Sequence, residues 1–129
     1  MESIVNAVEV ELRQLSVALT WPRRGECLAC YLDRMMQHGC TGELRWAGRY
    51  RDLMAPRATG LERRLGTMGG YCDCEVLMNA YVPLACLAEP AAAPPELGPC
   101  RGVRPGSTQP CALWSRRPRY AGWADGYSA

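Results

Sequence analysis

The residues best suited to chemistry in this sequence lie in one short stretch, Gly69-Gly70-Tyr71-Cys72-Asp73-Cys74-Glu75-Val76-Leu77-Met78-Asn79. After a glycine pair that lets the backbone turn freely, two thiols, two carboxylates and one amide follow within eight residues. Thiols and carboxylates are metal ligands, and thiols also perform redox chemistry. This stretch is therefore the first candidate for a functional site.

Three further Cys precede this motif. Cys27 and Cys30 form a Cys-x-x-Cys pair, which suits one zinc ion or a redox dithiol, and Cys40 directly follows a glycine. The predicted helix over residues 26–38 carries one apolar stripe, and Cys30 lies roughly 150° from its centre at 100° per residue, whereas Cys27 lies roughly 90° away. Packing of this helix in an apolar core therefore does not explain the position of Cys30. The stripe consists of Leu28, Tyr31, Leu32 and Met35.

Other helices must hold these side chains in place. Apolar residues spaced by three and four predict an amphipathic helix over residues 2–20, which we interpret as packing material. Trp21-Pro22 ends that helix, because proline disfavours helical geometry in the preceding residue. Shorter helices are predicted over residues 47–54 and 60–68. The first stripe consists of Ile4, Val8, Leu12, Leu15 and Leu19.

The conformation of residues 72–80 stays open at this level. On a strand, Cys72 and Cys74 would share one face with Val76, while Asp73 would point to the other side. A helix that starts with Asp73 as its N-cap fits the same residues. Over so few positions, periodicity cannot separate the two alternatives.

Composition changes near residue 88. Seven of the ten prolines lie in residues 88–129, with few aliphatic residues among them. Such a segment buries too little apolar surface to offset its ordering entropy. We therefore predict a domain over residues 1–87 and a flexible tail over residues 88–129, in which Cys100 and Cys111 would be incidental.

Charge limits the partners of the chain. Residues 1–87 contain ten Arg and ten acidic residues, and the whole excess of +2 lies in residues 88–129. Because the predicted domain is neutral, we expect no nucleic-acid binding. A protein partner at the Arg-rich surface or the tail stays open, and the sequence gives no indication of the oligomeric state. The surface arginines are Arg45, Arg49, Arg51, Arg57, Arg63 and Arg64.

No stretch of the sequence resembles a secretory leader or a membrane span. This predicts a cytoplasmic protein without membrane contact. In that compartment thiols stay reduced, so clustered Cys indicate metal or redox chemistry before structural disulfides.

The motif at residues 69–79 resembles a bacterial family of unknown function, domain family 2695, whose mark is Gly-Gly-Tyr-Cys-Asp-Cys-Glu-Val-Leu-x-Asn. Cys27 to Met35 and Gly39-Cys40 also resemble its longer members, so the similarity covers residues 26–80. Many members follow the equivalent of Cys40 with Asp-His, where this chain has Thr41-Gly42. A ligand role for that His is therefore not carried over, and the resemblance implies kinship without an activity.

Together, these patterns predict a small, helix-rich α+β domain with a short strand or extended segment at the Cys-x-Cys motif. They favour one structural zinc ion bound by Cys40, Cys72 and Cys74. A fourth ligand would come from Cys27, Cys30 or His38. Two alternatives remain: a thiol–disulfide protein using Cys72/Cys74 or Cys27/Cys30, and an interaction module with purely structural Cys. A non-redox enzyme has little support, because a single His and no evident nucleophile–base pair are present.

Overall fold

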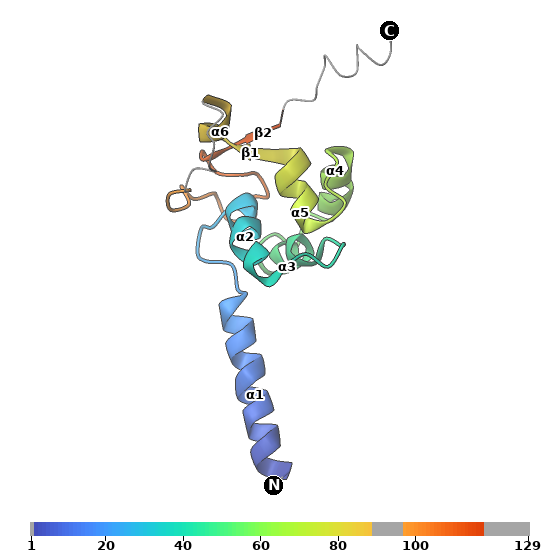
Figure 1. Cartoon of the computed structure of the whole chain (residues 1–129), viewed down its shortest axis with the longest axis vertical. Helices are drawn as coiled ribbons and strands as arrows, with labels where there is room; N and C mark the ends of the chain where they lie inside the picture. Colours follow the sequence, from blue (N-terminus) through green and yellow to red (C-terminus); the bar gives the residue numbers. More distant parts are fainter. Residues whose placement is uncertain (1, 89–96, 118–129) are drawn as a thin grey trace.

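The computed structural model describes residues 2–88 and 97–117, which form a helix-rich body with one two-stranded sheet (Figure 1). The predicted α+β class is confirmed. The α-helices are α1 (Glu2–Leu19), α2 (Leu28–Met35), α3 (Arg45–Met54), α4 (Leu61–Thr67), α5 (Asp73–Glu75) and α6 (Leu84–Ala88). A 3-10 turn η1 (Met36–His38) extends α2, a π-helical turn η2 (Val76–Ala80) extends α5, and the strands are β1 (Tyr81–Pro83) and β2 (Trp114–Arg116).

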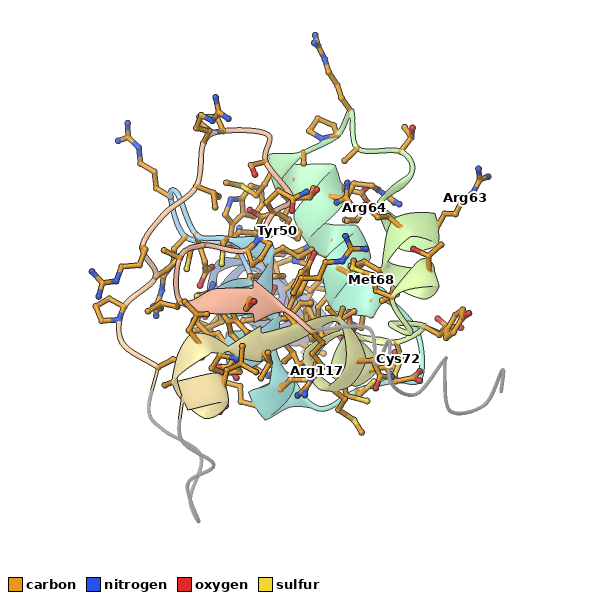
Figure 2. The ribbon with its side chains drawn as sticks, turned by 90° about the horizontal axis from the view of Figure 1, so that it is seen from above. Tyr50, Arg63, Arg64, Met68, Cys72 and Arg117 are labelled. Atoms are coloured by element: carbon orange, nitrogen blue, oxygen red, sulfur yellow. The ribbon has the colours of Figure 1, made fainter. Side chains whose placement is uncertain are left out.

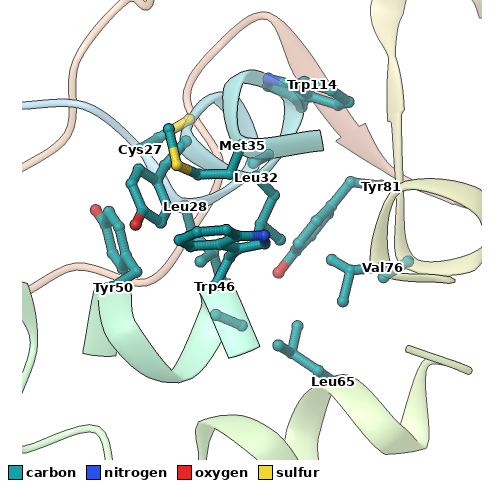
Figure 3. Close-up of a cluster of buried hydrophobic side chains, with 14 of the residues drawn as sticks. Cys27, Leu28, Leu32, Met35, Trp46, Tyr50, Leu65, Val76, Tyr81 and Trp114 are labelled. Atoms are coloured by element: carbon teal, nitrogen blue, oxygen red, sulfur yellow. The ribbon is translucent and has the colours of Figure 1, made fainter. Parts of the chain in front are cut away.

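The core lies between α2, α3 and α4 and contains several aromatic rings (Figure 3). The predicted stripe of α2 is fully buried, as the sequence indicated. Tyr31 and Tyr50 lie in this core with ring centroids 5.6 Å apart. Their hydroxyls donate to the carbonyls of Thr20 and Glu26, each at 2.7 Å, so neither phenol is buried without a partner. Trp46, Leu61, Leu65 and Val76 complete the centre of the cluster.

The predicted N-terminal helix forms as α1, but its apolar stripe does not pack on the body. Figure 1 shows α1 projecting away from the other helices, and Ile4 and Leu12 are 67% and 59% exposed. The expectation that this helix is packing material is thus wrong for the described residues, because periodicity identifies an apolar face but not what covers it. Within residues 2–88 and 97–117 no helix, α1 included, combines the length and apolarity that a membrane span needs.

Residues 72–80 adopt the helical alternative. Cys72 is extended (φ −141°, ψ 169°), α5 starts at Asp73, and η2 continues the helix before the chain becomes β1. The strand expected at the Cys-x-Cys motif therefore lies just beyond it. The motif spans the junction between an extended residue and a helix, so the alternation of faces along a strand does not apply to its two Cys.

Residues 97–117 pack against the body, which differs from the expectation of a flexible tail starting at residue 88. Strand β2 pairs antiparallel with β1 in the register Tyr81↔Arg116 and Pro83↔Trp114. Trp114 is buried, and the Val103 amide donates to the Gly25 carbonyl at 2.9 Å. Buried side chains and a few backbone hydrogen bonds hold this proline-rich segment in place. Average composition cannot predict such individual contacts. The other parts of the predicted tail, residues 89–96 and 118–129, lie outside the described residues.

Candidate metal centres

Seven of the eight Cys gather in two separate clusters among the described residues. In each cluster, all sulfurs lie within 4.8 Å of one another. We call the first the four-Cys cluster; its members are Cys27, Cys30, Cys100 and Cys111. The second, the three-Cys cluster, consists of Cys40, Cys72 and Cys74. Cys86 belongs to neither, and every Cys is a free thiol.

The four-Cys cluster joins the start of α2 to the segment that carries β2. Cys27 is the N-cap of α2, and its sulfur accepts a hydrogen bond from the Cys30 amide at 3.3 Å. Cys100 lies in the loop before Val103, and Cys111 precedes β2. Cys27 and Cys111 are buried, while Cys30 and Cys100 are half-buried. Sulfurs from three separate stretches of chain thus meet at one point inside the molecule.

Polar hydrogens surround the sulfurs of this cluster. The Cys27 and Gly102 amides donate to Cys100 Sγ at 3.2 and 3.3 Å, and the Trp114 indole donates to Cys30 Sγ at 3.2 Å. N–H donors aimed at sulfur favour the thiolate, the form that ligates metals. The sulfurs of Cys30 and Cys111 lie 3.8 Å apart. Two sulfurs bound tetrahedrally to one zinc at 2.3 Å would be separated by about 3.8 Å.

The thiols of this cluster differ in their pKa. The Cys30 side chain donates to Cys27 and lowers the pKa of Cys27 to about 5, with further help from the backbone amides of Cys30 and Cys111. Holding that proton raises the pKa of Cys30, and burial adds to the increase. Burial also raises the pKa of Cys100, so the shift towards the thiolate falls on Cys27. Arg23, Arg24 and Arg34 line the hollow beside Cys30 and Cys100 together with Asp33 and Glu26, and Glu26 pairs with Arg34 at 2.8 Å.

The three-Cys cluster lies at the side of the body where α5 begins (Figure 2 labels Cys72). Cys72 is buried, Cys74 is half-buried, and Cys40, just after η1, is exposed. The sulfurs of Cys72 and Cys74 are 3.2 Å apart. Because Cys40 faces solvent, one side of the cluster is open.

Two polar residues of the motif, Asn79 and Asp73, build the scaffold of this cluster. Asn79 Nδ2 donates to the Gly69 carbonyl at 2.8 Å, which ties the last residue of the motif to its first. A side chain at Gly70 would lie 2.8 Å from Val76 Cγ2, so only glycine fits there. The buried Asp73 carboxylate accepts from the amides of Trp46 and Ala47 at 2.9 and 3.0 Å. Asp73 thereby caps the N-terminus of α3 and is not a metal ligand in this arrangement.

The two clusters share one local turn. Cys40-Thr41-Gly42 and Cys100-Arg101-Gly102 both place glycine at positive φ, +84° and +85°. In each turn the glycine amide donates back to the Cys sulfur, at 3.4 and 3.3 Å respectively. Positive φ strongly favours glycine, which explains the shared Cys-x-Gly spacing. This pattern was the sequence signal that would have connected Cys100 to a site.

The thiols of the three-Cys cluster also divide in acidity. The Cys74 and Gly42 amides lower the pKa of Cys40 by donating to its sulfur. Burial raises the pKa of Cys72 to about 12, and the neighbouring Cys74, Cys40 and Glu75 side chains add to this increase. One exposed, acidic thiol therefore lies beside one buried, weakly acidic thiol.

The structure divides the predicted ligand set. It brings Cys40, Cys72 and Cys74 together, as expected, but places Cys27 and Cys30 in the other cluster. His38 joins neither group among the described residues, and its ring lies near Trp46, with centroids 5.7 Å apart. Cys100 and Cys111, which we expected to be incidental, complete the four-Cys cluster. Composition did not predict their role in a cluster, because these two cysteines lie in a proline-rich segment.

Several of the surface arginines interact with other side chains or carbonyls of the chain. Arg45 lies 4.3 Å from the centre of the Trp46 ring, and Arg49 donates to the Thr20 carbonyl at 3.1 Å. Arg51 pairs with Glu62 and Asp52. In Figure 2, Arg63 points outward from α4, whereas the neighbouring Arg64 is directed into the body, where it donates to Thr108. The arginines thus differ in accessibility, and the expected lack of nucleic-acid binding stays a prediction.

Fold and site together define a helix-rich domain with two thiol clusters. Residues 28–79 match the model of a family described as a protein of unknown function (DUF2695). The resemblance seen in the sequence is therefore confirmed over this segment. No curated protein and no solved structure matches the chain. The matched segment contains the whole three-Cys cluster but only Cys30 of the four-Cys cluster.

Proposed function

We propose that this protein is a zinc-binding protein whose four-Cys cluster holds one structural Zn²⁺. The observation that carries this proposal is the convergence of four sulfurs, each within 4.8 Å of the others. A tetrahedral site with four thiolates is typical of zinc, and a closed set of four protein ligands is typical of a structural site. The proposal differs from the ligand set expected from the sequence by replacing Cys40, Cys72 and Cys74 with the four-Cys cluster.

The placement of the ligands supports a structural role. Zinc at this point would connect α2 to a segment more than seventy residues away along the chain, because Cys27 and Cys100 are 73 positions apart. The described chain is small, and small domains gain disproportionately from such a connection. Ordering residues 97–117 against α2 and β1 is what the ion would contribute.

The test is the metal content of protein purified without chelator, measured by elemental analysis. In a Cys40→Ser, Cys74→Ser chain, whose three-Cys cluster is disabled, one zinc per chain should remain. Adding Cys111→Ser to this double variant should remove the zinc. Adding Cys86→Ser, which alters a thiol outside both clusters, should leave the zinc bound. Absence of zinc in the double variant, or its replacement by stoichiometric iron, would contradict the proposal.

Metal affinity at this site should also fall as pH falls. Ligating thiols must be deprotonated, so protons compete with the ion, and the competition grows as the pH drops further below the thiol pKa values. A zinc titration of the double variant between pH 8 and pH 5, conditions chosen for the experiment, should show this loss. A pH-independent affinity would indicate that thiolates are not the ligands.

A further inference from the structure

We infer that the three-Cys cluster is a second metal site, which binds one thiophilic ion such as Zn²⁺ through Cys40, Cys72 and Cys74 and leaves one coordination position open to an external donor. This inference is independent of the proposed structural zinc, since the two clusters share no residue. Three protein ligands with a free fourth position are the arrangement in which zinc binds water or a substrate.

Ligand geometry is the first support. The three sulfurs already lie within 4.8 Å of one another. The Glu75 side chain hydrogen-bonds to Cys72, but neither it nor any other His, Asp or Glu of the described residues lies within that distance of all three sulfurs. Around one zinc at 2.3 Å, tetrahedral sulfurs would be about 3.8 Å apart. The Cys72 and Cys74 sulfurs, at 3.2 Å, need only small side-chain rotations to reach that separation.

A second and independent observation comes from the backbone. Cys40 and Cys100 each begin a Cys-x-Gly turn of the same kind. In both turns the glycine amide donates to the Cys sulfur. This turn presents a sulfur with its own N–H donor, an arrangement suited to a thiolate. A turn of this kind at an exposed Cys has no packing role, since Cys40 is exposed.

The rigidity around the cluster is the third support. Asp73 lies between the two Cys of the motif, and its carboxylate is fixed by the amides of Trp46 and Ala47. The Asp73 amide in turn donates to the Glu43 carbonyl at 3.2 Å. These bonds join the motif to the chain that follows Cys40. The three thiols are thus held together by groups that are not themselves ligands, as a preorganised site requires.

Solvent access decides the character of the site. The four-Cys cluster encloses its centre with four sulfurs, whereas the three-Cys cluster presents the exposed Cys40 and has only three members among the described residues. On binding, each thiol releases its proton to solvent and each thiolate donates an electron pair to the ion. Zn²⁺ with three thiolates then has room for one external nitrogen, oxygen or sulfur donor. We therefore expect this ion to exchange faster than the enclosed one.

The experiment counts ions in the full chain, loaded with Zn²⁺ or Co²⁺ under reducing conditions. Wild type should bind two ions, and Cys40→Ser, Cys74→Ser should bind one. Cys86→Ser is the matched control and should bind two. Cys40 is exposed and Cys74 is half-buried, so circular dichroism of each variant checks that the fold is kept.

Imidazole then tests the open position. Added to Co²⁺-loaded wild type, it should change the absorbance of one of the two ions, and it should leave the spectrum of the double variant unchanged. No spectral change in wild type would contradict the open position. A Cys72–Cys74 disulfide forming in place of ion binding would overturn the inference and favour the redox alternative.

The two proposals fail separately. If wild type and the double variant both bind one ion, the second site is wrong and the structural zinc stands. If wild type binds one ion and the double variant binds none, the structural zinc is wrong and the three-Cys site stands.

Discussion

The two thiol clusters differ in which parts of the chain supply their cysteines. The three-Cys cluster lies entirely within residues 28–79, the segment that matches the family. The four-Cys cluster takes Cys100 and Cys111 from a proline-rich segment beyond that match. One cluster is thus built inside a compact sequence motif, and the other is assembled from distant stretches of chain.

The clusters differ equally in what they do to the fold. The four-Cys cluster brings Cys100 and Cys111 of residues 97–117 beside the start of α2. In the three-Cys cluster, Cys40 is exposed, and the neighbouring Asp73 caps the N-terminus of α3. Similar thiol groups in one small chain thus differ in their burial and in how far apart their cysteines lie along the sequence. We expect loss of the first cluster to affect folding, and loss of the second to affect ion binding alone.

Truncation should have the largest effect. A chain ending at Leu87 loses Cys100, Cys111 and β2, and therefore half of the four-Cys cluster. Binding a structural zinc contributes on the order of 10 kcal/mol, comparable to the total stability of a domain. We expect this chain to lack stoichiometric zinc and to show no cooperative thermal transition by circular dichroism.

A chain ending at Arg117 is the matched control, because it keeps every contact described above for the four-Cys cluster and β2. It should melt like the full chain and keep its zinc. An unchanged melting temperature in the chain ending at Leu87 would break the comparison, since the four-Cys cluster would then have no structural role.

Removing the Asp73 carboxylate should have an intermediate effect. Asp73→Ala leaves the amides of Trp46 and Ala47 without their acceptors in a buried position. Losing a cap and two buried hydrogen bonds should lower the free energy of unfolding by about 2–4 kcal/mol. Urea denaturation measures this change.

The control is Asp52→Ala, which removes an exposed carboxylate paired with Arg51 and should cost less than about 1 kcal/mol. Asp73→Ala should also weaken the second equivalent of zinc while the enclosed one remains. Equal loss of both ions would contradict the separation of the two clusters.

Local patterns in the sequence were sufficient for part of this architecture. The stripe of α2 is buried as its spacing predicted, and the grouping of Cys40 with Cys72 and Cys74 followed from the motif and the glycine before Cys40. These inferences succeeded because they depend on helical periodicity and on residues that are close along the chain.

Contacts between residues far apart along the chain could not be predicted in the same way. Cys30 was correctly recognised as unsuited to the apolar stripe of its helix, but its partners lie some seventy and eighty positions away, at Cys100 and Cys111. Average composition described residues 88–129 as flexible, although the buried Trp114 and the register of β2 fix part of them. The conformation of residues 72–80 was also undetermined, because a turn of helix and a strand fit so few residues equally well.

The smallest effect should come from the apolar stripe of α1, which tests whether either cluster depends on this helix. Leu12 is 59% exposed, whereas Leu32 in α2 is fully buried. Leu32→Ala should lower the free energy of unfolding by about 2–5 kcal/mol, because it removes buried surface and leaves a cavity. Leu12→Ala removes a side chain that is already in solvent and should change it by less than about 0.5 kcal/mol. Both variants should be measured by urea denaturation at several protein concentrations, with zinc content determined in parallel. A loss of stability in Leu12→Ala that matches Leu32→Ala, or a loss of either ion, would show that α1 is covered in solution and contributes to the sites.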